Sequence, residues 1–198
     1  MAKRLFDLAG AGLALLLLAP LLLLLALAIR LDSAGPVFFR QERVGRLGVL
    51  FRIHKFRTMR VDAPALGLPL TVGRDARITR VGHWLRHYRL DELPQFLDVL
   101  LGRMSLVGPR PEVPRYVAHY PAALRDRVLA VRPGITDPAS LAHIDEAALL
   151  AAAADPEREY IERILPPKLA LQAAYAERAT LWTDLAVLAR TLRVVLSR

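Results

Sequence analysis

The stretch at residues 87–111 reads HYRLDELPQFLDVLLGRMSLVGPRP and places two adjacent carboxylates, Asp91 and Glu92, directly before an apolar run with helical spacing. Acidic residues at the start of a helix accept hydrogen bonds from free backbone N–H groups and complement the helix dipole, which is a purely structural role. Neighbouring helical positions point about 100° apart, so the two carboxylates can also divide a chemical task. One could attack a substrate while the other holds a metal ion or a proton.

The same stretch ends in the tripeptide Pro109-Arg110-Pro111. Two prolines restrict the backbone on both sides of the arginine, so its planar guanidinium has little conformational freedom. A guanidinium held in this way suits the binding of a phosphate group or a planar base. The tripeptide is also common in ordinary turns, and by itself it does not choose between these interpretations.

Upstream of this stretch, residues 37–43 and 49–58 are rich in β-branched and aromatic side chains and flank Gly45 and Gly48. This pattern predicts an antiparallel β-hairpin. Lys55 and Arg57 lie near the end of its second strand and, being two residues apart, share a face. They are either a clamp for a diphosphate or a solvated basic edge that prevents aggregation.

Residues 8–29 form an apolar segment without a charge, preceded by Lys3 and Arg4. As one straight helix the segment would be about 33 Å long, enough to cross a bilayer. Three interpretations compete: a cleaved signal peptide, a spanning helix kinked at Pro20, and a re-entrant helix-break-helix with arms at residues 8–19 and 21–29.

Charge favours the re-entrant form. Basic residues prefer the cytoplasmic side of a membrane, and a spanning helix would place one basic flank on the wrong side. A hairpin in the membrane satisfies both flanks, and the chain then divides into a membrane segment at residues 1–31 and a cytoplasmic domain at residues 32–198. The second flank contains Arg40, Arg43, Arg46, Arg52, Lys55, Arg57 and Arg60.

The rest of the chain predicts helices separated by proline- and glycine-containing turns. We expect a loop at residues 61–72 and helices at residues 78–89, 93–101, 114–131, 145–154 and 167–196. The last of these has apolar residues at helical spacing, which indicates either core packing or a helix lying in the membrane interface. The expected fold class is therefore α+β: mostly helical, with a small antiparallel β-hairpin, an N-terminal re-entrant membrane helix and interfacial amphipathic helices.

The composition excludes some classes of site but does not identify the function. The 198 residues suffice for one core, and the absence of cysteine excludes disulfides and thiolate metal sites. Of the net charge of +9, all lies in residues 1–110, which contain 17 basic and 8 acidic residues. A basic surface attracts nucleic acid, anionic lipid or a phosphorylated small molecule. The histidines show no metal-binding spacing, and no phosphate-binding glycine loop is present.

Four segments in this order resemble the bacterial sugar transferase family, the monotopic phosphoglycosyl transferases that begin membrane glycoconjugate assembly. They are VFFRQERVGRLGVLFRIHKFRTM, RLDELPQFLDVLLGRMSLVGPRPE, RPGIT and LPPKLALQAAY. The resemblance implies transfer of a phosphosugar from a UDP-sugar to polyprenol phosphate, with release of UMP. It also implies a Mg²⁺ requirement, a covalent phosphosugar–aspartate intermediate, and a place on the cytoplasmic face of the inner membrane, in contact with membrane lipid.

Carried over residue by residue, the resemblance gives each matched position a role. Asp91 is expected to be the nucleophile and Glu92 its partner, with both as candidate ligands of Mg²⁺. Arg110, held by Pro109 and Pro111, is expected near the nucleotide, and Arg86 matches a basic residue just ahead of the two carboxylates. With Lys55 and Arg57 these residues form the expected substrate site, and Pro20 is the expected membrane bend.

Two positions depart from the family pattern. Ala19 stands where many relatives have a serine before the proline, and Asp137 stands where many have a glycine after RPGIT. No nucleic-acid partner is expected, and the sequence leaves the oligomeric state open, a homodimer included. The alternatives are a membrane-anchored basic module that binds anionic lipid or nucleic acid without catalysis, and an aspartate-dependent phosphatase or pyrophosphatase.

Overall fold

The computed structural model describes residues 1–197 apart from 67–69, 72–74 and 144. This described part is mostly helical and contains three small two-stranded sheets, two of them antiparallel. At this level the expected fold class is confirmed. The predicted loop at residues 61–72 contains a short 3₁₀ turn at Ala63–Leu66, and its following residues 67–69 and 72 lie outside the described part.

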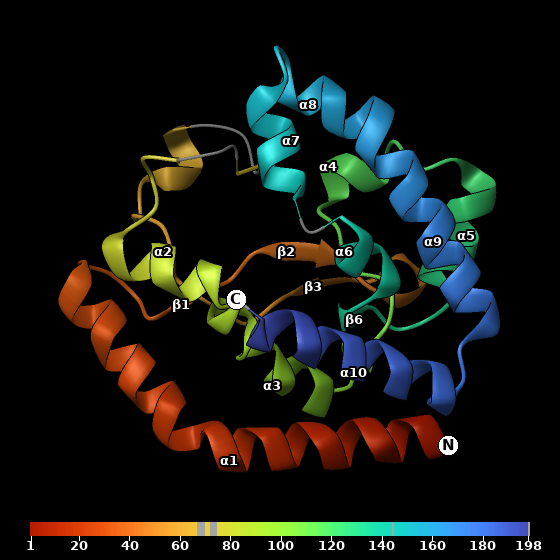
Figure 1. The fold of residues 1–198 in the computed structure, drawn as a ribbon, viewed down its shortest axis with the longest axis horizontal. Helices are drawn as coiled ribbons and strands as arrows, with labels where there is room; N and C mark the ends of the chain where they lie inside the picture. Colours follow the sequence, from red (N-terminus) through yellow and green to blue (C-terminus); the bar gives the residue numbers. More distant parts are fainter. Residues whose placement is uncertain (67–69, 72–74, 144, 198) are drawn as a thin grey trace.

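Helix α1 (Ala2–Asp32) contains the apolar N-terminal segment and runs without interruption through Pro20. Figure 1 shows that it bends sharply near its middle and so divides into two arms. Sharp bends in helices arise mostly at proline, which removes one backbone hydrogen bond and clashes with the preceding turn. The expected break at Pro20 is therefore a bend within one continuous helix.

Both arms of α1 pack against the rest of the chain. On the first arm, Ala11 belongs to a buried cluster with Val99 and Leu106, and on the second, Leu25 and Ile29 are buried. The outer side is different, because by length and composition α1 could cross a membrane and only 11% of its most apolar window is buried. The exposed leucines on this helix include Leu13, Leu16, Leu17, Leu23, Leu24 and Leu27.

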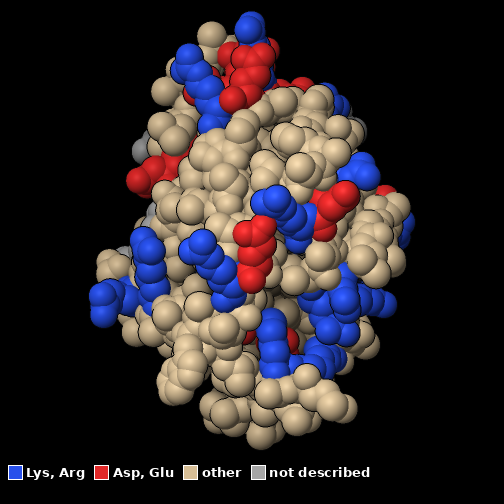
Figure 2. All heavy atoms as spheres, turned by 90° about the vertical axis from the view of Figure 1, so that its right-hand side faces the viewer, with Lys and Arg blue, Asp and Glu red and all other residues tan. Residues whose placement is uncertain are grey.

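Charged side chains are unevenly distributed over the surface of the molecule. Figure 2 shows that the lower end of the molecule, which α1 forms in Figure 1, carries residues other than Lys, Arg, Asp and Glu. Lys and Arg side chains gather directly above this end. On the face shown in Figure 2, an uncharged end thus lies below a band of Lys and Arg side chains, which we call the basic belt, and a membrane surface with anionic lipids would favour this arrangement.

The β-hairpin predicted from residues 37–43 and 49–58 is confirmed, as two short ladders. Strand β1 (Phe38–Phe39) pairs with β4 (Lys55–Phe56), and β2 (Glu42–Val44) pairs with β3 (Leu50–Arg52). The turn between β2 and β3 is a 3₁₀ segment, Arg46–Gly48, in which Leu47 and Gly48 have φ values of 57° and 79°. Strand β4 of this hairpin carries Lys55.

The carboxylate pair lies on a short turn between two helices. Helix α2 (Arg80–His87) ends before Arg89, whose φ of 59° reverses the chain direction. The pair then falls in a 3₁₀ turn, Leu90–Glu92, which leads into helix α3 (Gln95–Leu100). The helices expected at residues 78–89 and 93–101 are confirmed, although both are shorter than predicted.

A parallel pair of strands, β5 (Ser105–Val107) and β6 (Gly134–Thr136), was not predicted. It places Gly108 and Gly134 so close that a Cβ on Gly134 would lie 2.0 Å from the backbone nitrogen of Gly108. Only glycine fits such an approach of two backbones. The contact fixes where the chain leaves β5 and enters the Pro-Arg-Pro tripeptide.

The remaining helices pack around a core that contains Tyr116, Tyr160 and Leu169. Helix α9 contacts both α5 and α6, and α10 contacts α6 and both strands of the parallel pair. The bounds are α4 (Pro114–Val117), α5 (Ala122–Leu129), α6 (Pro138–Ala142), α7 (Glu146–Ala152), α8 (Pro156–Glu159), a π-helical turn at Tyr160–Ile164, α9 (Leu165–Arg178) and α10 (Leu181–Leu196).

Two segments that we predicted as single long helices each form two helices, so these two predictions are wrong. The segment at residues 114–131 divides into α4 and α5, because Pro121 disfavours helical geometry in the residue before it and starts a new helix. The segment at residues 167–196 divides into α9 and α10, because Thr180 is extended and its side chain caps α10 through a capping box with Thr183. Residues 145–154 contain α7, as predicted.

Candidate active site

The two adjacent carboxylates are buried at the centre of a charge cluster. Asp91 is 2% exposed and Glu92 is 8% exposed. Lys55, on strand β4, reaches both: its Nζ lies 2.8 Å from Oδ2 of Asp91 and 3.3 Å from Oε1 of Glu92. Buried carboxylates need such partners, since an isolated ionised group in the interior is strongly destabilising.

Arg110 supplies the second cation of the cluster. Its two terminal nitrogens donate to the two carboxylate oxygens of Glu92, with Nη1 at 2.9 Å from Oε2 and Nη2 bonded to Oε1. Burial raises the pKa of Glu92, but the charges of Arg110 and Lys55 outweigh burial and hold it well below its ordinary value. Glu92 in turn raises the pKa of Arg110. Both side chains therefore stay ionised.

The backbone around Arg110 is fixed by a buried aspartate, Asp137, which stood out in the sequence only as a departure from the family pattern. Asp137 is fully buried, and its Oδ2 accepts from the backbone nitrogen of Arg110 at 3.0 Å and from Nε2 of Gln172 at 2.7 Å. Its Oδ1 accepts from the backbone nitrogen of Ser140 at 2.6 Å, which caps helix α6. Asp137 is thus a positioning residue for Arg110.

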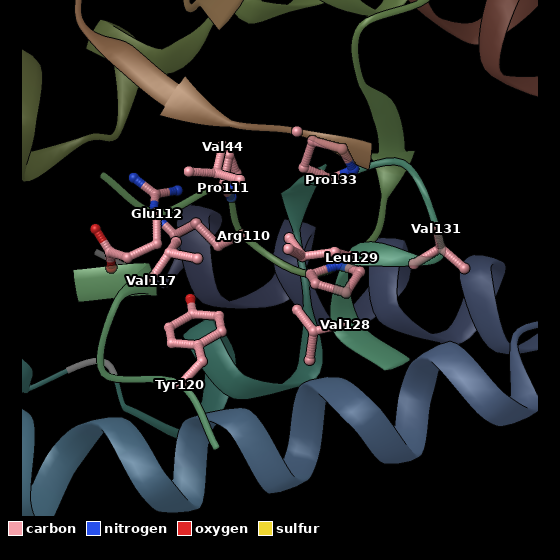
Figure 3. Close-up of a pocket in the computed structure, with 12 residues that line it drawn as sticks. Val44, Arg110, Pro111, Glu112, Val117, Tyr120, Val128, Leu129, Val131 and Pro133 are labelled. Atoms are coloured by element: carbon pink, nitrogen blue, oxygen red, sulfur yellow. The ribbon is translucent and has the colours of Figure 1, made fainter. Parts of the chain in front are cut away.

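The other side of the Pro-Arg-Pro segment is packed against the hairpin. The Pro111 carbonyl accepts from Nη1 of Arg43 at 3.0 Å, and the neighbouring Glu112 pairs with Arg43 at 3.2 Å. Figure 3 shows the small recess here, with Tyr120 and Val128 on the side opposite Pro111. Its volume of about 10 Å³ is barely that of one water molecule. This recess is part of the packing and does not hold a substrate.

Arg86 lies near the carboxylates, whereas Arg57 is engaged elsewhere. The Nε of Arg86 donates to the Thr58 hydroxyl and its Nη1 to the Thr71 hydroxyl, both at 2.8 Å. Burial lowers the pKa of Arg86, and the charge of Asp91 acts in the opposite direction. Arg57 donates to the carbonyl oxygens of Ile29, Ser33 and Ala34 at the end of α1. The structure therefore brings Lys55 and Arg110 into contact with the carboxylates and places Arg86 near them, whereas Arg57 holds the end of α1.

A mainly apolar cavity of about 260 Å³ adjoins this cluster. Arg89, Glu92 and Arg110 are its charged lining residues, and Asp91 does not line it. The rest of the lining comes from several elements, among them the second half of helix α10. The apolar lining side chains include Phe96, Leu106, Ile135, Leu141, Leu188 and Leu192.

The carboxylates offer the oxygen ligands that Mg²⁺ prefers. Within the described residues no group of three or more His, Cys, Asp or Glu side chains gathers at one point. Mg²⁺ is often held by only one or two carboxylates together with the phosphates of a substrate. Asp91 and Glu92 fit that pattern, with a phosphorylated substrate needed to complete the coordination.

A family model described as bacterial sugar transferase matches residues 1–198. Over 197 residues the chain is 39% identical to the UDP-N-acetylgalactosamine-undecaprenyl-phosphate N-acetylgalactosaminephosphotransferase of Aeromonas hydrophila, covering 98% of this chain and 44% of the relative. It is 38% identical to the UDP-glucose:undecaprenyl-phosphate glucose-1-phosphate transferase of Caulobacter vibrioides, covering 98% of this chain and 70% of the relative.

A protein of Escherichia coli with the same printed name as the Caulobacter relative is 44% identical over 136 residues, which is 68% of this chain and 29% of the relative. The chain thus spans less than half the length of two of these three relatives. All three names describe a transferase that uses a UDP-sugar and undecaprenyl phosphate.

Proposed function

Because the chain belongs to the bacterial sugar transferase family, we propose that it moves a phosphosugar from a UDP-sugar to a polyprenol phosphate and releases UMP. The names of its relatives support the substrate classes. The observation that carries the proposal is the buried cluster in which Lys55 and Arg110 face Asp91 and Glu92. Two carboxylates beside two cations and a third basic residue, Arg86, suit phosphoryl chemistry on an anionic diphosphate.

The proposed reaction has two displacements at the same phosphorus atom. A carboxylate oxygen of Asp91 attacks the sugar-bearing phosphorus of the donor, and the bond from that phosphorus to UMP breaks, with its electron pair leaving on UMP. A phosphate oxygen of the polyprenol phosphate then attacks the phosphorus, and the bond to Asp91 breaks, which restores the carboxylate. The product is a polyprenyl diphosphosugar.

Lys55 has to change partners for the first displacement. In the structure its Nζ lies 2.8 Å from Asp91, and the Asp91 side chain is only 3% exposed. When an anionic diphosphate enters, the lysine exchanges a carboxylate for a phosphate, which frees Asp91 and neutralises charge on the donor. Lysine suits this exchange because its ammonium is a point charge on a flexible stem.

Arg110 and Glu92 form the fixed part of the site. Their bidentate pair and the hydrogen bond from Arg110 to Asp137 keep the guanidinium in one place. A cation fixed in advance stabilises the charge that develops in the transition state without reorganising during the reaction. We place Arg110 on the diphosphate and Glu92 as the group that orients it.

Mg²⁺, when bound at Asp91 and Glu92, would neutralise charge on the donor diphosphate and act as a Lewis acid there. The chain's own part is to supply the two carboxylates side by side on one turn, Leu90–Glu92. Arg86 stays in the cluster and balances its negative charge while Lys55 moves to the donor.

The membrane location follows from α1. Its outer leucines are exposed, and the basic belt lies directly above them. We place the bent helix in the cytoplasmic leaflet of the inner membrane as a re-entrant segment, with both termini on the cytoplasmic side, because both flanks are basic. Helix α10, which exposes Trp182 and Leu185, would then lie in the interface.

The test is a screen for UMP release across UDP-sugars, with and without polyprenol phosphate. With acceptor, we expect sustained release for at least one sugar. Without acceptor, we expect at most one turnover, and a donor labelled in the sugar-bearing phosphate should leave its label on the protein. Sustained release without acceptor would indicate a phosphatase or pyrophosphatase instead, and no release from any donor would favour the non-catalytic basic module.

The Asp91→Asn variant tests the nucleophile. It should abolish both labelling and transfer, because an amide oxygen is a far poorer nucleophile than a carboxylate. Asp62→Asn is the matched control, since Asp62 pairs with Arg60 on the surface and its side chain is 50% exposed. Normal transfer by Asp91→Asn would refute the role of Asp91.

A further inference from the structure

The cavity beside the charge cluster has an unusual distribution of polarity. Its volume is about 260 Å³, and its charged lining residues are Arg89, Glu92 and Arg110, which together carry two positive charges and one negative charge. Most of the remaining lining is apolar and includes leucine and valine side chains of helix α10 and Phe96 of α3. A ligand that matches this cavity therefore has an anionic group at one end and an apolar body.

The apolar lining excludes the polar parts of the donor. A sugar ring or a uracil placed among Leu106, Ile135 and Leu188 would lose hydrogen bonds to water without replacing them, which is unfavourable. The two threonine hydroxyls in the lining, on Thr136 and Thr191, already bond to each other at 2.8 Å. An apolar chain has no such requirement.

Size and position limit how much of a chain can enter. A cavity of about 150 Å³ accepts a benzene ring, so about 260 Å³ suits roughly one or two five-carbon units. Leu192 lines the cavity and is nevertheless 61% exposed. The wall formed by α10 is thus also part of the outer surface, and a longer chain can continue past Leu192 toward the membrane.

We propose that this cavity binds the phosphate-proximal end of the acceptor's polyprenyl chain, with the acceptor phosphate beside Arg110 once the UMP of the donor has left. The assignment rests on the proposed function for the identity of the ligand. Because Glu92 and Arg110 line the cavity and Asp91 does not, the acceptor would reach the cluster from the cavity side.

The experiment first measures binding alone. Geranyl phosphate is titrated into the protein without a donor, so the result does not depend on turnover. Val195→Trp fills the cavity and should weaken binding about tenfold, because apolar contact of a short chain is lost. Leu196→Trp is the matched control: it introduces the same side chain one residue further along α10, at a position that is 83% exposed and does not line the cavity.

A second pair of variants tests the cavity at a position where a substitution should not disturb folding. Leu192→Gln should weaken binding severalfold, and since Leu192 is mostly exposed, the polar side chain should not disturb folding; Leu196→Gln is its control. In steady-state assays with long-chain polyprenyl phosphate, the lining variants should raise KM for the acceptor and leave KM for the UDP-sugar within about twofold of the wild-type value.

The outcomes separate the two proposals. Equal binding by lining and control variants, or a raised KM for the donor alone, would overturn the cavity assignment. Weaker geranyl phosphate binding by the lining variants, in a protein that releases no UMP from any UDP-sugar, would support the cavity and refute the proposed transferase. UMP release together with an acceptor KM that no lining variant changes would support the proposed transferase and overturn the cavity assignment.

Discussion

At the scale of single residues, the site depends on two basic side chains with different freedom. Lys55 contacts both carboxylates through its single Nζ atom. Arg110 donates to Glu92 through two guanidinium nitrogens, and its backbone nitrogen donates to Asp137. A point charge can move to a substrate, while a bidentate fork stays in place. This difference is why we assign the mobile role to Lys55.

Arg110→Lys should show that charge alone is not enough. A lysine keeps the positive charge but cannot bond both oxygens of Glu92 at once, so we expect kcat/KM for the UDP-sugar to fall about a hundredfold. Steady-state kinetics measure this. The control is Arg115→Lys, which makes the same exchange in an exposed pair with Glu157 and should change little. Equal kinetics of Arg110→Lys and wild type would contradict the fixed-fork role.

Asp137 lies at the position where the family resemblance predicts a glycine, and the structure gives it three donors. Asp137→Ala should lower the free energy of unfolding by about 3 kcal/mol, because buried donors on Arg110, Ser140 and Gln172 lose their acceptor. Asp137→Asn retains one acceptor oxygen and should lose less. Denaturation in detergent compares the two, and identical midpoints for Ala and wild type would show that these bonds contribute nothing.

Sequence patterns reveal local contacts and miss distant ones. Asp91, Glu92 and Arg110 stand within one short stretch, so their nearness was predictable, as was the hairpin that carries Lys55. Asp137 and Gln172 meet across 35 positions, and no spacing rule signals that contact. A polar residue directly after a short apolar strand and before a proline was the available signal for Asp137, because it is typical of a helix N-cap.

At the scale of elements, helix α1 is tied to the domain by buried polar contacts that its apolar sequence conceals. Asp7 is 2% exposed and accepts from the hydroxyl of Ser105 and the backbone nitrogen of Leu106. Lys3 pairs at 2.5 Å with Asp184 of α10. These contacts link α1 to strand β5 and helix α10, and β5 leads directly into the Pro-Arg-Pro segment. The sequence shows Asp7 and Lys3 only as charges next to an apolar run.

Pro20→Ala tests whether the bend sets the topology. In a helix interior alanine is more favourable than proline by about 3 kcal/mol, so the variant should form a straighter helix. We therefore expect some molecules to place the two flanks of α1 on opposite sides of the membrane. Because the chain has no cysteine, single cysteines at Ala2 and Val61 report each flank to an impermeant maleimide. In the parent protein both should label from one side.

The matched control for this topology test is Ala19→Ser, which changes the neighbouring residue and retains the proline. It should label like the parent protein. Same-side labelling of Pro20→Ala would show that packing of the two arms, rather than the proline, determines the bend. Opposite-side labelling of the parent would contradict the re-entrant placement.

At the scale of the whole molecule, two forces could hold the chain at a membrane: the apolar side of α1 and the basic belt above it. Salt separates them. At about 1 M salt the Debye length is about 3 Å, so electrostatic attraction to anionic lipid is screened, while apolar burial persists. The overall excess of basic residues was evident from the sequence, but their position relative to α1 depends on the fold.

We expect the protein to remain with the membrane pellet in about 1 M salt, because α1 is inserted and not only attracted. Leu16→Asp with Leu23→Asp should make it extractable, since each aspartate in the hydrocarbon costs about 3 kcal/mol. Leu47→Asp, on the hairpin turn and equally exposed, is the control and should stay in the pellet. Release of the parent protein by salt alone would mean that the basic surface carries the attachment, and the bent helix would then need another role.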